Sequence, residues 1–331
     1  MSSATAAPAI APDGPPPSPP AADMVWIPSG ECVIGSDAHY PEERPAHRAT
    51  VDGFWIDRYP VTNERFARFV DETGYVTFAE LPPNAAEYPG ARPEMLSPGS
   101  LVFTKPHHPV DMSQIANWWA FLLGADWRHP QGPDSSLDGL AKHPVVHVAY
   151  IDVESYATWV GKQIPTEVEW EYAARGGLDN AVYAWGNEFL PNGTFMANTW
   201  QGRFPYENLL ADGFEGTSPV GHFPPSGYGL HDMIGNVWEW TADWYRLSRT
   251  PAGSDCCGPS AAAASVDRCL PGIRIPRKVL KGGSHLCAPN YCRRYRPAAR
   301  YPQPIDTSTS HVGFRLIART SSGREKAEPL P

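Results

Sequence analysis

Proline is the feature of this sequence that most restricts what it can fold into. The chain has 331 residues, of which 37 are proline and 29 are glycine, so proline reaches roughly twice its ordinary share of about 5%. Proline fixes the backbone angle φ and has no backbone N–H to donate, so it interrupts helices and strands alike. We therefore expect a loop-rich fold of short elements. Much of its buried area should come from the 12 Trp, 14 Tyr and 12 Phe, because large rings cover much surface per residue.

The composition of the two ends predicts where this fold begins and stops. Residues 1–22 contain seven Pro and seven Ala, and such a segment cannot bury enough apolar surface to offset the entropy lost on ordering. We predict a disordered tail over residues 1–22, a single domain over 23–320 and a polar C-terminal tail over 321–331. The N-terminus has neither the basic nor the apolar region of a secretory signal, and no apolar run approaches the ~18 residues of a membrane span.

The net charge indicates which classes of partner to exclude, and the cysteine content indicates the cellular compartment. The formal net charge of −9 argues against nucleic acid or an anionic membrane as the main partner. Six cysteines in the chain are too few for a disulfide scaffold. The expectation is a cytoplasmic protein whose thiols are mostly reduced.

Local patterns predict early strands and three short helices. The segments are 24–36 and 47–62 for strands, and 62–74, 152–162 and 166–177 for helices. Val, Ile and Trp content favours strands in the first two. The first helix can be capped by Thr62 and ended by Gly74, and the second has apolar residues at helical spacing. In the third, Thr166 and Glu169 have the spacing of a capping box, and Gly176 provides the stop.

The two cysteines in LCAPNYC are the most distinctive chemical feature. Cys287 and Cys292 lie five residues apart, a spacing that puts side chains on opposite faces of a strand and about 140° apart on a helix. The Pro-Asn between them favours a turn, which can fold the two sulfurs toward each other. Two unrelated buried thiols, half of a zinc site and a soft low-coordinate ion such as Cu(I) all remain open. Zinc, however, needs two further ligands, and no CxxC partner is present.

A run of arginines follows the second cysteine. Its members are Arg293, Arg294, Arg296 and Arg300. An arginine that faces the loop would favour the thiolate over the thiol. An arginine on the outer face would only be solvated, so the sequence alone does not say which of them acts on the cysteines.

Two further segments carry oxygen ligands suited to a hard cation. In GYGLHDMIGNVWEWTADWY, the oxygens of Asp232, Asn236 and Glu239, with a glycine that can aim a carbonyl, suit Ca²⁺. The alternative is a turn whose tryptophans join the core. In ANTWQGRFPYENLLADGFEG, Asn198 and Asp212 could close a loop around a second cation.

The remaining histidines and cysteines suggest structural roles. His143 and His147 in HPVVH have the spacing of a helical zinc pair, but Pro144 and two valines favour a strand there, and no third ligand is evident. Cys32 is expected to be a small core residue. No role is assigned to Cys256, Cys257 or Cys269.

Motifs along residues 24–318 occur in a characteristic order. They are MVWIPSG, DGFWIDRYPVTNERFARFV, GADWRHPQGPDS, HPVVHV, PTEVEWEYAARGG, ANTWQG, DGFEGTSPV, GYGLHDMIGNVWEWT, KGGSHLCAPNYCRRYRPAAR and GFRL. Together they resemble the formylglycine-generating enzymes, the sulfatase-modifying factor family, of bacterial type. PTEVEWEYAARGG and GNVWEWT mark the wider superfamily, and GGSHLC with a second cysteine five residues on marks its catalytic branch. The resemblance implies an α+β single domain with low regular secondary-structure content, related to C-type lectin-like domains.

The resemblance also implies an activity and its cofactor. The family uses O₂ and Cu(I) to oxidise one cysteine in a CxPxR-type motif of unfolded or nascent sulfatase polypeptides to Cα-formylglycine. Cys287 and Cys292 match the two copper ligands, and the substrate thiolate is expected to join them as a third sulfur. Ser284 matches the active-site serine, and Trp238 lies where a family tryptophan lines the oxygen pocket.

Two calcium sites are implied in the same way. The first consists of Asn198, the Thr199 carbonyl, Asp212 and the Phe214 carbonyl. The second, which some members have, consists of Asp232, the Gly235 and Val237 carbonyls, and Glu239. Both sets coincide with the oxygen-rich segments that the residue types had already singled out.

Five positions depart from the family pattern. Ala288 follows the first catalytic cysteine where relatives often have histidine, and His311 stands where some have asparagine, so the oxygen pocket or proton delivery could differ. Pro60 replaces an acidic residue, which could weaken a calcium shell. Pro297 and Leu316 stand where animal members have disulfide cysteines, consistent with a reducing compartment.

Three other functions compete with a copper-dependent oxidase. A non-catalytic relative could bind partners through the same groove, but inactive relatives lack the cysteine pair. An iron-dependent sulfoxide synthase of ergothioneine type shares the fold, but it needs a helical domain with an HxxxHxE site, which HPVVHVA does not supply. A thiol–disulfide oxidoreductase would cycle a disulfide between the two cysteines against thioredoxin.

Overall fold

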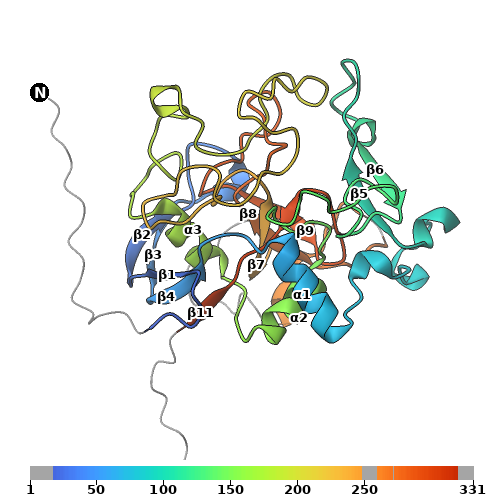
Figure 1. Cartoon of the computed structure of the whole chain (residues 1–331), viewed down its shortest axis with the longest axis horizontal. Coiled ribbons are helices and arrows are strands. Elements are labelled where there is room, and N and C mark those ends of the chain that lie inside the picture. Colours follow the sequence, from blue (N-terminus) through green and yellow to red (C-terminus); the bar gives the residue numbers. More distant parts are fainter. Residues whose placement is uncertain (1–17, 248–258, 271, 320–331) are drawn as a thin grey trace, which may run out of the picture.

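The computed structural model describes residues 18–247, 259–270 and 272–319 (Figure 1). Its strands are β1 (Met24–Ile27), β2 (Gly30–Ile34), β3 (His47–Val51), β4 (Phe54–Asp57), β5 (Gly99–Phe103), β6 (Trp119–Leu123), β7 (Trp238–Trp244), β8 (Arg277–Lys281), β9 (Arg300–Pro304), β10 (Val312–Gly313) and β11 (Ile317–Arg319). Its α-helices are α1 (Asn63–Thr73), α2 (Tyr150–Trp159), α3 (Glu167–Arg175) and α4 (Pro259–Ser265). Its 3₁₀ helices are η1 (Pro41–Glu43), η2 (Phe78–Glu80), η3 (Ala85–Glu87), η4 (Pro93–Leu96), η5 (Ile115–Asn117) and η6 (Pro191–Gly193).

The elements are short, as the proline content predicts. Within the described residues, the longest strand is β7 with seven residues and the longest helix is α1 with eleven. No helix in this part of the chain is long and apolar enough to cross a membrane. The predicted tails lie mostly outside the described residues, and so do Cys256 and Cys257.

The described strands form four small sheets. β4 pairs antiparallel with both β1 and β11, so the beginning and the end of the fold close on each other. A four-stranded sheet with the order β10-β7-β8-β9 lies at the centre of the molecule, between β1–β4 on one side and the β5–β6 pair on the other (Figure 1). The segment that carries the two cysteines connects β8 to β9, which are neighbours in this sheet.

The helix signals in the sequence are confirmed, with differences at the ends. In α3 the Thr166 hydroxyl accepts from the Glu169 amide and the Glu169 carboxylate accepts from the Thr166 amide, which is the expected capping box. Gly176 ends this helix with a φ of 57°, a conformation that suits glycine because it has no Cβ. In α1 the Thr62 hydroxyl makes no capping bond. The helix α2 begins at Tyr150, earlier than the expected start at residue 152.

The strand predicted across HPVVH is wrong. His147 has a φ of 59°, a left-handed conformation that strands do not contain. Its ring is buried, with Nε2 donating to the Pro130 carbonyl at 2.9 Å and Nδ1 in hydrogen-bond contact with the Ser100 hydroxyl at 2.7 Å. Burial lowers the pKa of His147 to about 4, so the ring is neutral. These bonds outweigh the β preference of the valines, and the structural role predicted for this histidine is confirmed.

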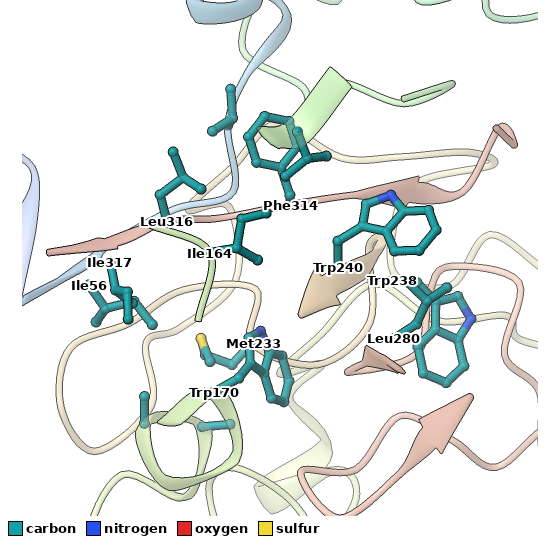
Figure 2. Packing of buried hydrophobic residues seen from close by; sticks show 14 of the residues in the cluster. Ile56, Ile164, Trp170, Met233, Trp238, Trp240, Leu280, Phe314, Leu316 and Ile317 are labelled. Atoms are coloured by element: carbon teal, nitrogen blue, oxygen red, sulfur yellow. The ribbon is translucent and has the colours of Figure 1, made fainter. Parts of the chain in front are cut away.

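The buried core has two parts that meet at the cysteine loop. The larger cluster includes Trp170, Trp238 and Trp240 (Figure 2), together with Cys287 and Cys292. The smaller cluster consists of Trp118, Trp200, Phe204, Leu286 and Ala288. Successive side chains of the loop therefore enter different clusters, so its backbone is held from both sides.

Asp152 shows how burial links this core to pH. Its carboxylate is fully buried and accepts bonds from the Ala149 and Phe78 amides and the Tyr75 hydroxyl. Burial raises the pKa of Asp152 from 3.8 to about 6. Because the folded state holds this proton more tightly than the unfolded state, the resulting stabilisation is present at low pH and is lost as the pH rises through about 6.

In Asp152→Asn this pH dependence should be missing. Between pH 4 and pH 7, the free energy of unfolding of the wild type should fall by about 2 kcal/mol relative to that of the variant. This figure follows from the size of the pKa shift. Urea unfolding followed by circular dichroism at several pH values measures this difference. The exposed Asp71→Asn serves as the control and should keep the wild-type pH profile. A difference for Asp152→Asn that does not change with pH would contradict the assignment.

Candidate active site

The cysteine loop folds two thiols against each other. The sulfurs of Cys287 and Cys292 are 3.2 Å apart, well beyond the ~2.05 Å of a disulfide, and both cysteines are free and buried. A turn brings them together, because the Tyr291 and Cys292 amides donate to the Ala288 carbonyl at 3.1 and 2.9 Å. The turn expected from the Pro-Asn pair is confirmed, and it leaves the sulfurs in hydrogen-bond contact.

The two thiols differ in how readily they ionise. The hydrogen bond with Cys287 lowers the pKa of Cys292 to about 6, with help from the positive charge of Arg294 and against the effect of burial. Burial, together with the same hydrogen bond, raises the pKa of Cys287 well above its usual value. The two thiols therefore ionise as a coupled pair, in which the hydrogen bond and Arg294 favour the negative charge on the Cys292 sulfur.

Of the four arginines that follow the pair, Arg294 is the one that faces a sulfur. Its Nη1 lies 3.7 Å from the Cys292 sulfur. Arg293 is exposed, and the remaining two are buried in ion pairs with glutamates. The structure thus decides which arginine favours the thiolate, a choice that the sequence left open.

The other two predicted catalytic residues, Ser284 and Trp238, are both buried. Ser284 is fully buried, its hydroxyl accepts from the Leu286 amide at 3.2 Å, and its carbonyl accepts from the Cys287 amide at 2.9 Å. Trp238 belongs to the same buried cluster as both cysteines, and its ring centre lies 5.9 Å from that of Tyr301. Ser284 therefore shapes the backbone that leads to the first thiol, and Trp238 lies against Tyr301 in the buried core.

Asn236 is a clamp rather than the oxygen ligand that its residue type suggested. Its side-chain amide bonds the Ser218 backbone in both directions, and its carbonyl accepts from both the amide and the ring of His285. The preceding residue is Gly235, whose backbone packs closely against the backbone of Asn198. A Cβ at position 235 would lie 2.4 Å from the Asn198 carbonyl oxygen, so glycine is required there. Asn236 thus fixes the start of the cysteine loop against the entry to β7.

Sequence reasoning missed two exposed tyrosines beside the cysteines. Tyr291 is 41% exposed and Tyr301 is 43% exposed. Tyr291 stacks on Phe204 with ring centres 4.3 Å apart. The spacing of Tyr291 within the loop was visible in the sequence, but its exposure depends on packing against a distant segment.

Two of the four members of the first predicted calcium set contact the same amide nitrogen. The Thr199 carbonyl and one Asp212 carboxylate oxygen both accept from the Gln201 side chain, the latter at 2.7 Å. The other Asp212 oxygen accepts from the Phe214 amide at 3.1 Å. The Asn198 side chain donates to a backbone carbonyl of the same loop. Two of the predicted oxygen ligands therefore point at the same position, which the side-chain NH₂ group of Gln201 occupies.

The second predicted calcium set is only partly suited to a cation. Both oxygens of the buried Glu239 accept from Arg315 at 2.8 to 3.0 Å, and Trp170 adds a bond at 2.7 Å. One oxygen of Asp232 accepts from the Gly221 amide at 2.8 Å. Its Oδ1 is buried and has no hydrogen-bond partner among the described residues. Arg315 thus already neutralises one carboxylate of this set, while Asp232 retains an acceptor.

The other described cysteines do not extend the site. Cys32 is buried, and burial raises its pKa to about 12, so it stays a thiol, as expected of a small core residue. Cys269 is exposed. Among the described residues, no group of three or more His, Cys, Asp or Glu side chains could hold a metal. A metal in this part of the chain would therefore rely on the cysteine pair or on mixed sets that include carbonyl and amide oxygens.

Comparison with known proteins identifies the family. Residues 12–320 match the family model described as "Sulfatase-modifying factor enzyme 1-like domain". The chain is 52% identical over 303 residues to the formylglycine-generating enzyme of Mycobacterium tuberculosis, covering 91% of this chain and 99% of that protein. It is 38% identical over 312 residues to the inactive Cα-formylglycine-generating enzyme 2 of Mus musculus, covering 92% and 88%.

A solved structure shares the fold. PvdO from Pseudomonas aeruginosa superposes with a TM-score of 0.59 at 24% sequence identity, over 90% of this chain and 94% of that one. A sequence identity of 24% indicates a shared fold and nothing about a shared function. The family model, by contrast, spans all described residues, and the chain covers almost the whole length of the mycobacterial relative. The chain therefore belongs to the sulfatase-modifying factor enzyme 1-like family.

Proposed function

We propose that this chain is an oxidase that converts a cysteine in a CxPxR-type motif of sulfatase polypeptides to Cα-formylglycine, using O₂ and Cu(I). The observation that carries the proposal is the pair of free, buried thiols 3.2 Å apart. The likeness to the mycobacterial formylglycine-generating enzyme supports it. Because the same family includes relatives named inactive, membership alone does not establish activity, and the thiol pair is the feature that favours it.

Cu(I) is the ion that best fits the cysteine pair. Two sulfurs with no further cluster of ligands among the described residues suit a soft ion of low coordination number, whereas zinc would need four ligands. The hydrogen bond and Arg294 favour a negative charge at Cys292, and loss of both thiol protons would give a two-thiolate site. When bound, Cu(I) would supply a soft redox centre that accepts a substrate thiolate and reacts with O₂.

The protein's own residues would prepare this site in three ways. The turn at Ala288 holds the two sulfurs on the same side of the loop. Burial of both cysteines keeps bulk water away from them. The Trp238 ring adds an apolar wall, and the Ser284 carbonyl fixes the amide of Cys287. A thiol-bearing peptide could then meet two preorganised sulfur donors in a dry environment, where electrostatic interactions are strong.

For calcium, the two oxygen sets support different conclusions. At the first set we propose Ca²⁺, because the Thr199 carbonyl and Asp212 already converge on one point, where the cation would replace the Gln201 amide. At the second set, the buried Asp232 oxygen, which has no hydrogen-bond partner in the part of the chain that the structure describes, favours a cation. The ion pair between Glu239 and Arg315 opposes one. Binding of Ca²⁺ at the second set therefore remains a prediction, and it requires that the ion pair between Arg315 and Glu239 be broken.

The proposed partner is a sulfatase chain that has not yet folded. A cysteine within CxPxR must reach two buried sulfurs, so it has to be presented by an extended segment rather than by a folded domain. The exposed tyrosines beside the pair offer flat rings against which such a segment can lie. We also propose the cytoplasm as the compartment, because the described cysteines are all free.

A peptide-conversion assay tests the proposal. Reduced protein loaded with one equivalent of Cu(I) should convert a CxPxR peptide in air at least about 10²-fold faster than metal-free protein, in line with metal-dependent catalysis. Mass spectrometry and an aldehyde-reactive probe detect the product, and a peptide with serine in place of the reacting cysteine is the control. If copper-loaded, reduced protein leaves every such peptide unchanged, the proposed function is wrong.

Thiol–disulfide exchange is a second candidate, favoured by the lowered pKa of Cys292 beside the Cys287 thiol. A thiolate next to a second thiol can form a disulfide through a mixed intermediate. In that case metal-free protein would cycle a 287–292 disulfide against a thioredoxin, and Cu(I) would inhibit it. The same two samples, metal-free and copper-loaded, thus separate the two functions by opposite responses to copper.

A further inference from the structure

Arg294 is held in place by contacts on both edges of its guanidinium group. Nε and Nη2 donate to a Glu42 carboxylate oxygen at 3.1 and 2.6 Å. Nη1 points the other way, to the Cys292 sulfur at 3.7 Å. The guanidinium carbon also lies 4.0 Å from the centre of the Tyr40 ring and 5.5 Å from that of Tyr301. The positive charge is therefore fixed beside the sulfur rather than free to move away.

The residues that hold Arg294 come from a segment about 250 positions earlier in the chain. Glu42 lies in η1, and the Tyr40 hydroxyl accepts from the Arg293 amide at 3.1 Å. The neighbouring Glu43 pairs with Arg296 in the buried interior, so this second ion pair adds no net charge. The η1 segment thus acts as a clamp on the stretch that follows Cys292.

The balance of charge at the pair depends on the metal. Two thiolates carry −2, so a bound monovalent ion leaves −1 and a bound divalent ion leaves zero. The positive charge of Arg294 lies closer to the Cys292 sulfur than the negative charge of Glu42 does, because Glu42 bonds the opposite edge of the guanidinium. A nearby positive charge stabilises the negative monovalent complex, and it gives little to the neutral divalent one. Burial makes the difference larger than it would be in water.

We propose that Arg294 is a specificity-determining residue that makes the cysteine pair prefer a soft monovalent ion over a soft divalent ion. The inference rests on the function proposed above, because it takes Cys287 and Cys292 as metal ligands. Arg294 does not bind the metal itself. It acts on the metal through the charge it places beside Cys292.

The test compares the affinities of two metals on the same protein. Cu(I) affinity is measured under anaerobic, reducing conditions by competition with a chromogenic Cu(I) chelator, and Cd(II) affinity by competition with a divalent chelator. In Arg294→Gln we expect Cu(I) affinity to fall at least tenfold, about 1.4 kcal/mol, while Cd(II) affinity stays the same or rises. Arg294→Lys keeps the charge and should retain most of the wild-type ratio of the two affinities.

Two further variants serve as controls. Arg293→Gln removes the same charge one residue away, at an exposed position, and should leave the ratio unchanged. Arg294→Met removes the charge but keeps an unbranched apolar stem against Tyr40, so it replaces Arg294→Gln if that variant does not fold. Equal loss of both metals in a neutral variant would show a merely structural role and overturn the inference. An unchanged ratio in both neutral variants would overturn it as well.

The outcome is separable from that of the proposed function. If the ratio changes as expected but no CxPxR peptide is converted, the proposed function fails and the specificity role of Arg294 stands. If wild-type protein converts the peptide and the neutral Arg294 variants keep the wild-type ratio, the specificity role alone fails.

Discussion

Cys292→Ser is expected to lower peptide conversion by about 10³-fold or more, the scale seen when one member of a catalytic group that acts as a unit is removed. The hydrogen bond with Cys287 lowers the pKa of Cys292, so the negative charge of the pair is favoured on this sulfur. A serine hydroxyl stays protonated and is a hard donor, so a soft ion would keep one sulfur instead of two. Conversion rates at saturating peptide and a defined Cu(I) load measure the loss.

Two other cysteines provide matched controls for this variant. Cys269→Ser alters an exposed thiol and Cys32→Ser alters a buried one on strand β2, outside the cysteine loop, and both should keep conversion within about twofold of wild type. Thermal unfolding of all three variants shows whether a loss of rate reflects a loss of fold. A Cys292→Ser protein that binds copper fully and converts peptide at more than about a tenth of the wild-type rate would contradict the role assigned to this thiolate.

Arg315→Met is expected to destabilise the fold by about 3–5 kcal/mol, because it leaves a buried carboxylate without its counter-charge. The Arg315 and Glu239 side chains are essentially unexposed. The same guanidinium also bonds the His231 and Asp232 carbonyls, so it ties the β7 strand to the turn before it. Urea unfolding in the presence of EDTA gives the change in the free energy of unfolding.

The matched control is Arg319→Met, which breaks an ion pair of the same kind at the surface. Arg319 also bonds a glutamate with two nitrogens, but its side chain is 39% exposed, and exposed pairs contribute about 0–1 kcal/mol. Equal destabilisation by the two variants would contradict the buried-pair argument. Adding Ca²⁺ supplies a further readout, since it should restore part of the stability of Arg315→Met if the oxygens of Asp232 and Glu239 can hold a cation once the guanidinium is gone.

Features that depend on a few neighbouring residues could be predicted from the sequence. The helix α3 has its expected capping box and glycine stop, because Thr166, Glu169 and Gly176 act within two turns of each other. The turn between the cysteines follows from Pro-Asn in the same way. Where a distant contact competes with local preference, the prediction fails. His147 sits in a valine-rich segment, yet bonds to Pro130 and Ser100 hold it in a left-handed conformation.

The sequence by itself determined the family, the short elements that proline imposes, and the two thiols as the chemical centre. Only the tertiary structure decided how those thiols behave. The choice of Arg294 over Arg293 depends on Glu42, 252 residues away, and the ion pair of Glu239 depends on Arg315, 76 residues away. The reason is physical: hydrogen bonds and ion pairs act over a few ångströms, so a partner far along the chain exerts its effect only after folding brings it close.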